Sequence, residues 1–324
     1  MDLVDFILRD KRDKQQEYTI HLFEFCNLSC PFCWQDHDNI VGIDTVLDKL
    51  ESIEKFFQKE MRKHVVLNIM GGEIFADEIF DEKLKNDYIS LAQGITDLGK
   101  KYKFESIGIN WVTNLVISKR DYVRDLLKAC RDMGCKSKLV TSYDPRGRFN
   151  KPNLEIFKEN VYDFWDDLEG IGVLLTKSNI KYWLSDPKDF MHELYHKGVK
   201  VYADYMPDCQ AERSMPTDKE HYDIFTHFID KYPKIEPIRS WIENERNVVS
   251  CRSSKLVLED GTMCLCGNLV QEPRDKAMYK TDIQKANNKP IEKAFLEKYN
   301  CSTCEYFHRC TLGCFMAHDY KYAE

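Results

Sequence analysis

The sequence predicts an α/β protein in which strands alternate with helices, followed by a smaller cysteine-rich region. Short apolar runs alternate with longer amphipathic stretches from about residue 18 to residue 208, a pattern typical of a parallel α/β layout. Thirteen cysteines are present, three of them within residues 26–33 and seven within residues 250–324. A length of 324 residues accommodates two domains, or one barrel-sized domain with an appendage.

The first part of the chain contains six expected strands separated by helical patterns. The helices are expected from apolar residues on one face, as at Val123, Leu126, Leu127 and Cys130, which follow the spacing i, i+3, i+4. The strands are expected at 18–25, 65–70, 106–112, 138–142, 170–175 and 199–203, and the helices at 44–62, 83–101, 119–133, 153–168 and 186–197. Periodicity alone permits a barrel, a partial barrel or an open doubly wound sheet.

The pattern changes after the sixth expected strand. Residues 209–250 form a bridge that contains a helix at 217–231, which Thr217 is expected to cap. A strand at 255–258 then meets a turn at Asp260-Gly261. We place the boundary near residues 235–245, which gives a first domain of residues 1–235 and a second of residues 236–324.

Composition excludes several classes of protein. The hydrophobic content of 43% and charged content of 31% suit a soluble globular chain rather than a disordered one. A net charge of -7 gives no footprint for general nucleic-acid binding. No apolar run approaches the roughly 20 residues of a membrane span, and the first residues do not resemble a signal peptide. We therefore expect a cytoplasmic protein with no membrane partner.

The cysteines are expected to bind metal rather than to form disulfides. An odd number of cysteines without an export signal argues against a disulfide framework. Cys130 and Cys135 flank the end of an expected helix, and we interpret them as buried apolar filler. The remaining clusters, near the start and the end of the chain, are candidate metal ligands.

The first cluster is Cys26, Cys30 and Cys33, with the spacing C-x3-C-x2-C directly after the first expected strand. Three thiolates on one short loop can ligate three irons of a [4Fe–4S] cluster. The fourth iron then lacks a protein ligand, and an open metal position is what catalysis at a metal requires. Zinc is the alternative, with His21 or His37 as a fourth ligand.

These residues resemble the cluster motif of the radical SAM superfamily, with the aromatic residue Phe32 before the third cysteine. Met70-Gly71-Gly72-Glu73, at the end of the second expected strand, is similar to the superfamily's Gly-Gly-Glu motif. Two glycines let a ligand approach the backbone, and a glutamate offers an acceptor for a cationic amine. The resemblance implies a partial (β/α)6 TIM-like barrel whose functional groups lie at the carboxyl ends of the strands.

The resemblance also implies which residues contact S-adenosylmethionine (SAM). Ser142, at the end of the fourth strand, is similar to the family's Ser-x-Asp segment, and either Arg146 or Arg148 is the arginine that follows. An ordinary Asp-Pro turn is the alternative interpretation of this segment. The SAM-binding residues implied are Phe32, Gly71, Gly72, Glu73, Ser142 and Arg148, and Thr113-Asn114 draws notice only because it ends the third strand.

The C-terminal cysteines resemble the SPASM extension of radical SAM enzymes, which holds auxiliary [4Fe–4S] clusters. The pattern is a cysteine, nine residues, Gly261, four residues and a cysteine, then C-x2-C-x5-C-x3-C. The resemblance implies that Cys251, Cys264, Cys266 and Cys314 bind one auxiliary cluster, and that Cys301, Cys304 and Cys310 take part in a second. A zinc ribbon of the last four cysteines is the alternative.

The second auxiliary cluster would lack a fourth cysteine. Two complete four-cysteine sites need eight ligands, and the region supplies seven. Either this cluster has an open or non-cysteine ligand, or only one auxiliary cluster forms. The other ligands considered are His308, His318, Asp319 and the distant Cys209.

The resemblance implies an enzyme that reductively cleaves SAM to a 5′-deoxyadenosyl radical, with electrons from a donor such as flavodoxin or ferredoxin. We expect a peptide or protein substrate, and a small-molecule dehydrogenase or other modifying enzyme is the alternative. A non-catalytic iron–sulfur or zinc protein is disfavoured by the Gly-Gly-Glu segment. Only 25 residues precede Cys26, so a leader-binding domain is expected to be a separate protein.

Overall fold

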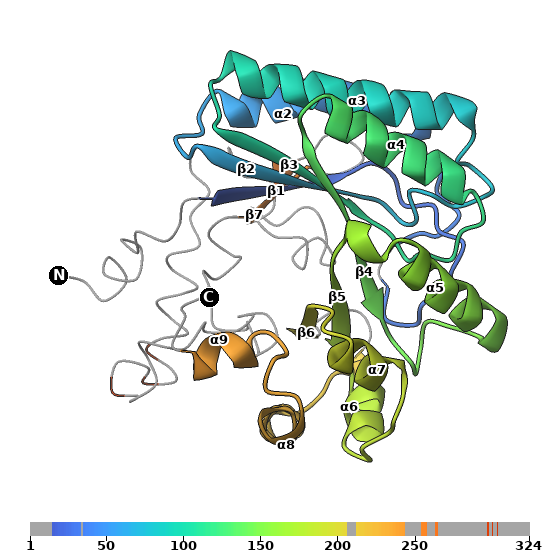
Figure 1. Cartoon of the computed structure of the whole chain (residues 1–324), viewed down its shortest axis with the longest axis vertical. Helices are drawn as coiled ribbons and strands as arrows, with labels where there is room; N and C mark the ends of the chain where they lie inside the picture. Colours follow the sequence, from blue (N-terminus) through green and yellow to red (C-terminus); the bar gives the residue numbers. More distant parts are fainter. Residues whose placement is uncertain are drawn as a thin grey trace.

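The computed structural model describes residues 15–33, 35–205, 212–243, 254–257 and 263–264, together with the single residues 297, 300 and 303. Its six main strands are parallel and curl into a half-barrel, with helices on the convex side (Figure 1). This arrangement confirms the partial barrel and excludes the open doubly wound sheet. Among the described residues, no helix combines the length and the apolar character needed to cross a membrane.

The strands follow one another across the sheet in sequence order. They are β1 (Gln15–His21), β2 (His64–Met70), β3 (Ser106–Val112), β4 (Lys136–Tyr143), β5 (Leu168–Leu175) and β6 (Val201–Tyr205), followed by β7 (Ser254–Val257) and β8 (Met263–Cys264). The sheet order is β6-β5-β4-β3-β2-β1-β7-β8. Strand β7 belongs to the region predicted as a second domain, and it pairs in parallel with β1, Glu17 opposite Ser254.

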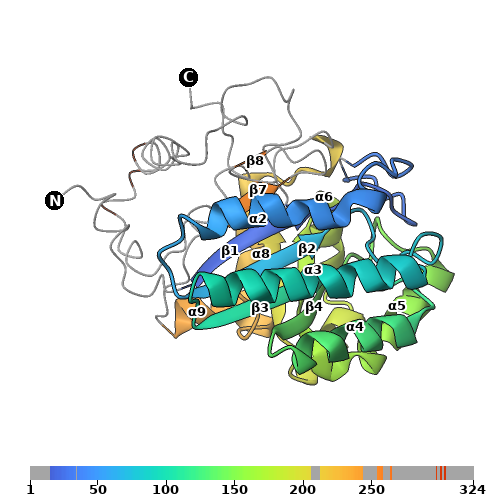
Figure 2. The same ribbon diagram turned by 90° about the horizontal axis from the view of Figure 1, so that it is seen from above.

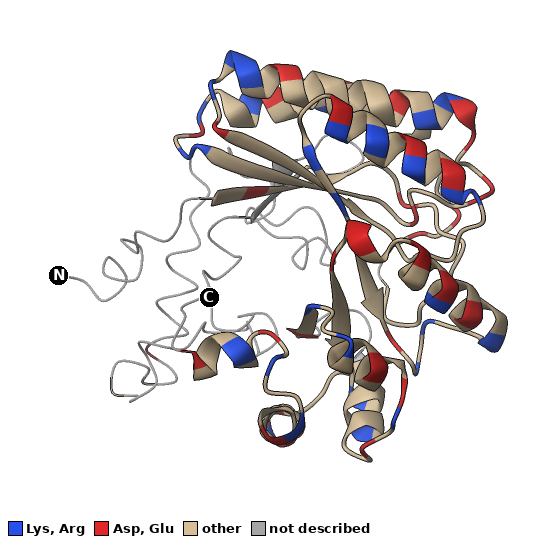
Figure 3. Ribbon diagram, viewed as in Figure 1, with Lys and Arg blue, Asp and Glu red and all other residues tan. Residues whose placement is uncertain are grey.

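The helices lie on the outside of the curled sheet. They are the short 3-10 turn η1 (Ile43–Asp48), then α2 (Lys49–Phe57), α3 (Glu82–Lys101), α4 (Arg120–Asp132), α5 (Lys151–Asp163), η2 (Trp165–Asp167), α6 (Lys177–Trp183), α7 (Phe190–His196), η3 (Glu212–Ser214), α8 (Asp218–Lys231) and α9 (Ile238–Ile242). Helices α2, α3 and α4 cover β1 to β4, and Figure 2 shows them side by side from above. The charged side chains gather on these outer helices, whereas the strands are mostly uncharged (Figure 3).

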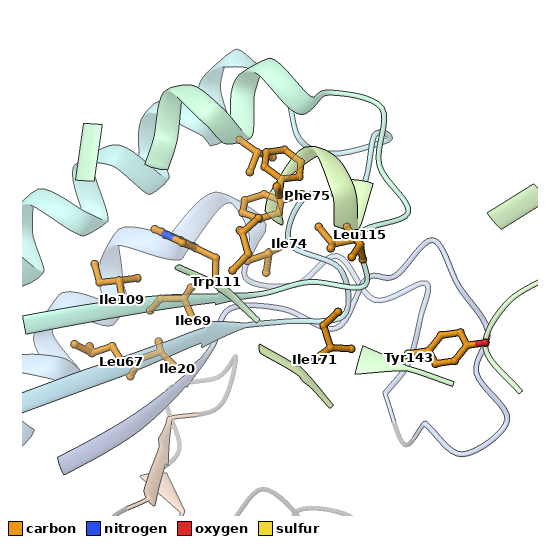
Figure 4. Packing of buried hydrophobic residues seen from close by; sticks show 14 of the residues in the cluster. Ile20, Leu67, Ile69, Ile74, Phe75, Ile109, Trp111, Leu115, Tyr143 and Ile171 are labelled. Atoms are coloured by element: carbon orange, nitrogen blue, oxygen red, sulfur yellow. The ribbon is translucent and has the colours of Figure 1, made fainter. Parts of the chain in front are cut away.

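Alternation along the strands separates a core face from a concave face. In β2 the odd-numbered residues Val65, Leu67 and Ile69 are fully buried, because neighbouring side chains of a strand point to opposite faces. Figure 4 shows Ile69 beside Trp111 of β3, and Leu67 lies opposite Ile109 in the next pair of the ladder. Complete burial of each such side chain contributes roughly 1.5–3 kcal/mol to folding, so this layer fixes the positions of the strand ends.

The concave face carries polar and apolar side chains together, since Val66 and Val112 alternate onto the same face as Asn68 and Asn110. Asn110 of β3 donates from Nδ2 to Oδ1 of Asn68 of β2 over 3.0 Å, and both residues are partly exposed. Glu17 of β1 hydrogen-bonds to Asn68, and burial raises the pKa of its carboxyl group. The interior of the half-barrel therefore offers amides and a carboxylate among apolar side chains.

Most expected elements are confirmed, and the differences have local causes. The expected helix 44–62 is divided, since Thr45 has non-helical angles (φ -120°, ψ 23°) inside the first turn, and the α-helix ends at Phe57. The expected helix 186–197 begins only at Phe190, because Asp189 caps it by accepting from the His192 N–H. Helices α6 and α9, of 7 and 5 residues, were not expected because so short a segment shows little periodicity.

Two smaller expectations are confirmed by side-chain contacts. Thr217 caps α8, and its side chain and that of Glu220 form a reciprocal capping box. Cys130 and Cys135 are buried, with 0% and 3% of their surfaces exposed, as expected of apolar filler.

Candidate functional site

The candidate site lies where β1 and β2 end, beside the turn that carries Cys26, Cys30 and Cys33. The backbone hydrogen bonding between β1 and β2 continues beyond the ends of the two strands. The N–H of Gly72 donates to the carbonyl of Phe23 over 3.0 Å, and the N–H of Glu73 donates to the carbonyl of Phe25 over 2.7 Å. The two sequence motifs are therefore held side by side by backbone hydrogen bonds.

Residue 72 must be glycine because neighbouring backbone atoms of the chain leave no room for a Cβ atom. A Cβ atom at residue 72 would lie 2.1 Å from the carbonyl oxygen of Phe25 and 2.2 Å from that of Glu24. Gly71 is also tight, since a Cβ there would lie 2.9 Å from the Phe23 carbonyl oxygen. The close approach at Gly72 is thus made by the segment leading to Cys26, whereas the sequence had suggested a ligand.

The three cysteines of the first cluster are free thiols and partly buried. The N–H of Cys33 donates to the carbonyl of Cys30 over 3.0 Å, which closes the turn between them. Burial raises the pKa of Cys26 to about 12, and the nearby Cys30 and Cys33 add to that rise. Burial is also the largest cause of the raised pKa values of Cys30 and Cys33. A metal must therefore displace protons when it binds here.

The surroundings of the thiols suit thiolate ligands. Cys26 Sγ accepts from the backbone N–H of Leu28 at 3.4 Å and from Asn114 Nδ2 at 3.8 Å. Arg148 lies beside Cys30, where its charge and hydrogen bond oppose the rise of that thiol's pKa. Donors and a cation around sulfur stabilise the negative charge of a thiolate-bound cluster.

A single metal ion fits this site poorly. Within the part of the chain that the structure describes, no three His, Cys, Asp or Glu side chains converge to hold one ion. His21, considered as a zinc ligand, instead lies 2.5 Å from Gln35 Nε2, measured at its own Nε2. A cluster in which each thiolate binds a different iron spreads its ligands further apart than one ion does. The iron–sulfur cluster on these thiols stays a prediction, with zinc as its alternative.

Glu73 is fully buried, and its carboxylate is occupied by neighbouring groups of this chain. It accepts from the N–H of Phe75 at 2.9 Å, from Thr113 Oγ1 at 2.8 Å and from the N–H of Asn114. Burial raises the pKa of Glu73 to about 7, although these hydrogen bonds oppose the rise. The carboxylate thus anchors the end of β3 to the Gly-Gly-Glu turn, whereas the sequence had suggested an acceptor for a ligand's amine.

Arg148 and Ser142 come together on the other side of the cysteine turn. Arg148 Nη1 donates to the carbonyl of Ser142 over 2.9 Å and to its Oγ over 2.5 Å. The guanidinium group lies 5.7 Å from the centre of the Phe32 ring. Arg146 instead lies over Tyr182, 4.3 Å from the ring centre. The structure therefore distinguishes the two arginines that the sequence left open.

The Asp-Pro turn considered as the alternative interpretation is also present. Asp144 Oδ1 accepts from the N–H of Arg146 over 3.0 Å, the two-residue spacing of an Asx turn. The turn directs the chain so that Arg148 returns to Ser142. The two interpretations of this segment are therefore compatible.

Three residues near the site were not selected from the sequence. Gln35 Nε2 donates to the carbonyl of Gly71 over 3.0 Å, and Asn114 contacts Cys26. Asp204 of β6 lies over Gly172, where a Cβ would come within 2.3 Å of its Oδ2. Of the three, only Asn114 could have been noticed in the sequence, because it ends the third expected strand.

Asp204 differs from the other carboxylates near the site. It is exposed on the concave side, yet the surrounding protein raises its pKa to about 6. Ser142 Cβ also lies within 3.4 Å of the Cβ position at Gly172, so Asp204 and Ser142 flank the same glycine. This places a solvent-accessible carboxylate with a raised pKa beside the segment that carries Arg148.

The C-terminal cysteine clusters fall outside the described residues. Of the seven, only Cys264 is described, as the backbone of the last residue of β8. The ligand sets predicted for auxiliary clusters, and Cys209, are therefore untested predictions.

Comparison with known proteins supports the fold at low sequence identity. No family model matches the sequence. No curated protein sequence matches it either. Native anSMEcpe with bound AdoMet superposes with a TM-score of 0.60 at 15% identity, covering 92% of this chain and 89% of that one. The same enzyme with bound AdoMet and Kp18Cys peptide gives 0.61 at 15% identity, covering 93% and 89%.

The fold is that of the radical SAM half-barrel. At this identity the likeness concerns the fold alone, and the positions of the motifs come from this chain's own geometry. In such barrels functional groups stand at the carboxyl ends of the strands. Here Cys26 follows β1, Glu73 follows β2 and Asn114 follows β3, so the site occupies the expected edge.

Proposed function

We propose that the protein is a radical SAM enzyme that modifies a peptide or protein. One observation carries the proposal: backbone hydrogen bonds hold the three-cysteine turn against the Gly-Gly-Glu turn at the carboxyl ends of β1 and β2. Neither motif alone is specific for radical SAM enzymes. Their side-by-side placement in a half-barrel is the arrangement expected for a cluster with an open iron beside a nucleoside ligand.

The residues divide into those that hold the cofactors and those that shape the site. Cys26, Cys30 and Cys33 would hold a [4Fe–4S] cluster, which together with bound SAM supplies a 5′-deoxyadenosyl radical. Arg148, held by Ser142, would bind the carboxylate or ribose of SAM. Phe32, Gly71 and Gly72 would line the SAM site, and Glu73 holds the end of β3 through its bonds to Thr113 and Asn114.

A peptide substrate is supported by the concave face and by a related fold. Asn68, Asn110 and Asp204 give the half-barrel interior the amide and carboxylate groups that peptide backbones and polar side chains bind. The solved structure of anSMEcpe with the Kp18Cys peptide supports a peptide partner for this chain. A small-molecule substrate is the outcome that would replace this part of the proposal.

Further partners follow from the chemistry. The cluster needs an external one-electron donor, for which we propose a flavodoxin or ferredoxin in the cytoplasm.

The C-terminal cysteines are proposed to hold one auxiliary cluster on Cys251, Cys264, Cys266 and Cys314, and part of a second on Cys301, Cys304 and Cys310.

The test is anaerobic reconstitution of the full chain with iron and sulfide, followed by SAM and dithionite. We expect a brown protein with more than about four irons per chain, since each cluster contributes four, and release of 5′-deoxyadenosine. Replacing Cys26, Cys30 and Cys33 by Ala should remove about four irons and all SAM cleavage. The matched control replaces the buried Cys130 and Cys135 by Ala and should retain both.

Zinc in stoichiometric amount with little iron would overturn the proposal. The substrate class is tested separately, by co-expression with candidate peptides and intact mass measurement. A mass change that depends on Cys26, Cys30 and Cys33 supports a peptide substrate. SAM cleavage without any peptide modification, but with turnover of a small alcohol or amine, favours the alternative.

A further inference from the structure

Asn114 uses both protons of its side-chain amide next to the cysteine turn. Nδ2 donates to Asn27 Oδ1 over 2.8 Å and contacts Cys26 Sγ at 3.8 Å, a distance that suits an N–H···S hydrogen bond because sulfur is large. Oδ1 accepts from the N–H of Val116 over 2.8 Å. The amide therefore has a fixed orientation, with its nitrogen toward the sulfur.

The loop that carries Asn114 is held from both sides. Before it, Thr113 Oγ1 and the N–H of Asn114 donate to Glu73. After it, Asn160 of α5 donates from Nδ2 to the carbonyls of Leu115 at 2.8 Å and Ile117 at 2.9 Å. Asn160 is fully buried, so these bonds are shielded from water.

The backbone of this loop is unusual in a way that fits a fixed role. Leu115 has φ of 57°, a left-handed conformation that residues with a Cβ atom adopt at a cost. Its side chain is fully buried in the core, as Figure 4 shows. The surrounding contacts impose this conformation, and its consequence is that the residue before it faces Cys26.

The cysteine turn is bound to the same loop by a second contact. Asn27 accepts from Asn114 and donates from its own Nδ2 to the carbonyl of Val116 over 2.7 Å. Asn27 follows Cys26 directly in the chain. The position of Cys26 Sγ relative to the Asn114 amide is therefore set by a reciprocal pair of hydrogen bonds.

We propose that Asn114 is a positioning residue of the three-cysteine site, which donates an N–H···S hydrogen bond to Cys26 and thereby raises the reduction potential of the cluster held there. The inference rests on the proposed function. A hydrogen bond to a ligand sulfur stabilises the more negative, reduced cluster, and such bonds are among the groups that set iron–sulfur potentials. Glu73 and Asn160 act at a distance by holding the loop.

The experiment is a redox titration of the reconstituted full-length chain. The observable is the electron paramagnetic resonance signal that changes when SAM is added, since that response separates this cluster from any others. Asn114→Ala removes the donor. Asn114→Asp removes the donor but keeps an oxygen that can accept from the Val116 N–H. The control is Asn86→Ala, which removes an exposed amide from the outer helix α3.

Both Asn114 variants are expected to lower the ratio of reduced to oxidised cluster about tenfold at a fixed potential, which is about 59 mV for one electron. Asn86→Ala should match the wild type. Thermal unfolding of each metal-free variant checks the fold, and a purely structural role would lower iron content while leaving the potential of the loaded fraction unchanged. That last result overturns the proposal.

Two failures are distinguishable. A SAM-responsive wild-type signal whose potential neither Asn114 variant shifts overturns the role of Asn114 and leaves the proposed function standing. Absence of any SAM-responsive iron–sulfur signal in the wild type overturns the proposed function, and this inference with it.

Discussion

Gly72 packs against Phe25 so closely that a methyl group at residue 72 would lie 2.1 Å from the Phe25 carbonyl oxygen. Phe25 is the residue before Cys26, and its carbonyl also accepts from the N–H of Glu73 over 2.7 Å. The second glycine of the Gly-Gly-Glu turn thus fixes the starting point of the cysteine turn. The contact joins the two motifs through backbone atoms, which cannot move aside by changing rotamer.

Gly72→Ala is expected to destabilise the fold and to displace the cysteine turn. The added methyl group meets two backbone carbonyls, so the cost should reach about 3 kcal/mol, the upper end of the range for overpacking. Urea unfolding of the metal-free protein measures it. Gly147→Ala is the control, because a Cβ there has only ordinary contacts of 3.5 Å and more. Equal stability of the two variants would contradict the steric argument.

Glu73→Gln is expected to remove a pH dependence of stability. Burial raises the pKa of Glu73 from 4.5 to about 7, so the folded state binds this proton more tightly than the unfolded state. The stability it supplies is complete below about pH 4.5 and is lost as the pH rises through about 7. Glutamine does not titrate, so wild type should lose up to about 3 kcal/mol relative to the variant between pH 5 and 8.

The measurement for Glu73 is urea unfolding of both metal-free proteins at several pH values. The exposed Glu78 provides the control, and Glu78→Gln should follow the wild-type pH profile. Apart from its pH dependence, Glu73→Gln should be less stable overall, since an amide NH2 group would face a donor that the carboxylate now accepts from. A pH profile parallel to wild type would show that Glu73 does not titrate in this range.

The sequence predicted the strands well because the apolar residues that form each strand are close together in the sequence. Val65, Leu67 and Ile69 stand in one short apolar run that predicts a strand, and all three side chains are buried. The partial barrel came from the resemblance of the two motifs, because periodicity left the closure of the sheet open. The curl depends on how strands twist and pack across the whole sheet, which a single strand does not encode.

The candidate site was predicted in part, for a similar reason. The cysteines and Gly-Gly-Glu were found by spacing, but the partners of Glu73 are Thr113 and Asn114, 40 and 41 residues away. Such contacts follow from the order of neighbouring strands. One sequence does not show them until β2 and β3 are known to be adjacent, so the sequence predicted a ligand contact for Glu73 but not these partners.

Arg148→Ala and Arg146→Ala are expected to differ sharply in SAM binding. Arg148 is held by Ser142 and lies beside Cys30, whereas Arg146 covers the ring of Tyr182. A charge-assisted contact contributes roughly 1.5–3 kcal/mol, so Arg148→Ala should weaken SAM binding about tenfold or more. Calorimetric titration of the reconstituted variants measures this. Comparable losses in both variants would remove the distinction drawn between the arginines.

Asp204→Asn is expected to stabilise the metal-free fold at high pH. The surrounding protein raises the pKa of Asp204 from 3.8 to about 6, and the structure gives it no ion pair among the described residues. Its stabilising proton is fully bound below about pH 3.8 and is lost as the pH rises through about 6. An asparagine keeps the shape without the charge, so the variant should gain stability at pH 8 and little at pH 4.

The comparison for Asp204 is Glu17→Gln on β1. Burial raises the pKa of Glu17 too, but hydrogen bonds to Gln15 and Asn68 and the charge of Lys200 oppose the rise, so its gain at pH 8 should be smaller. Thermal unfolding of wild type and both variants at pH 4 and pH 8 measures the difference. Asp204 is partly solvated, which reduces the gain below what its pKa alone implies.

A carboxylate that lowers stability on the concave face is expected to interact with a substrate. The proposed function therefore predicts that Asp204→Asn loses peptide modification and retains SAM cleavage. A variant that is no more stable at pH 8 than at pH 4, relative to wild type, would show that Asp204 is well solvated or paired.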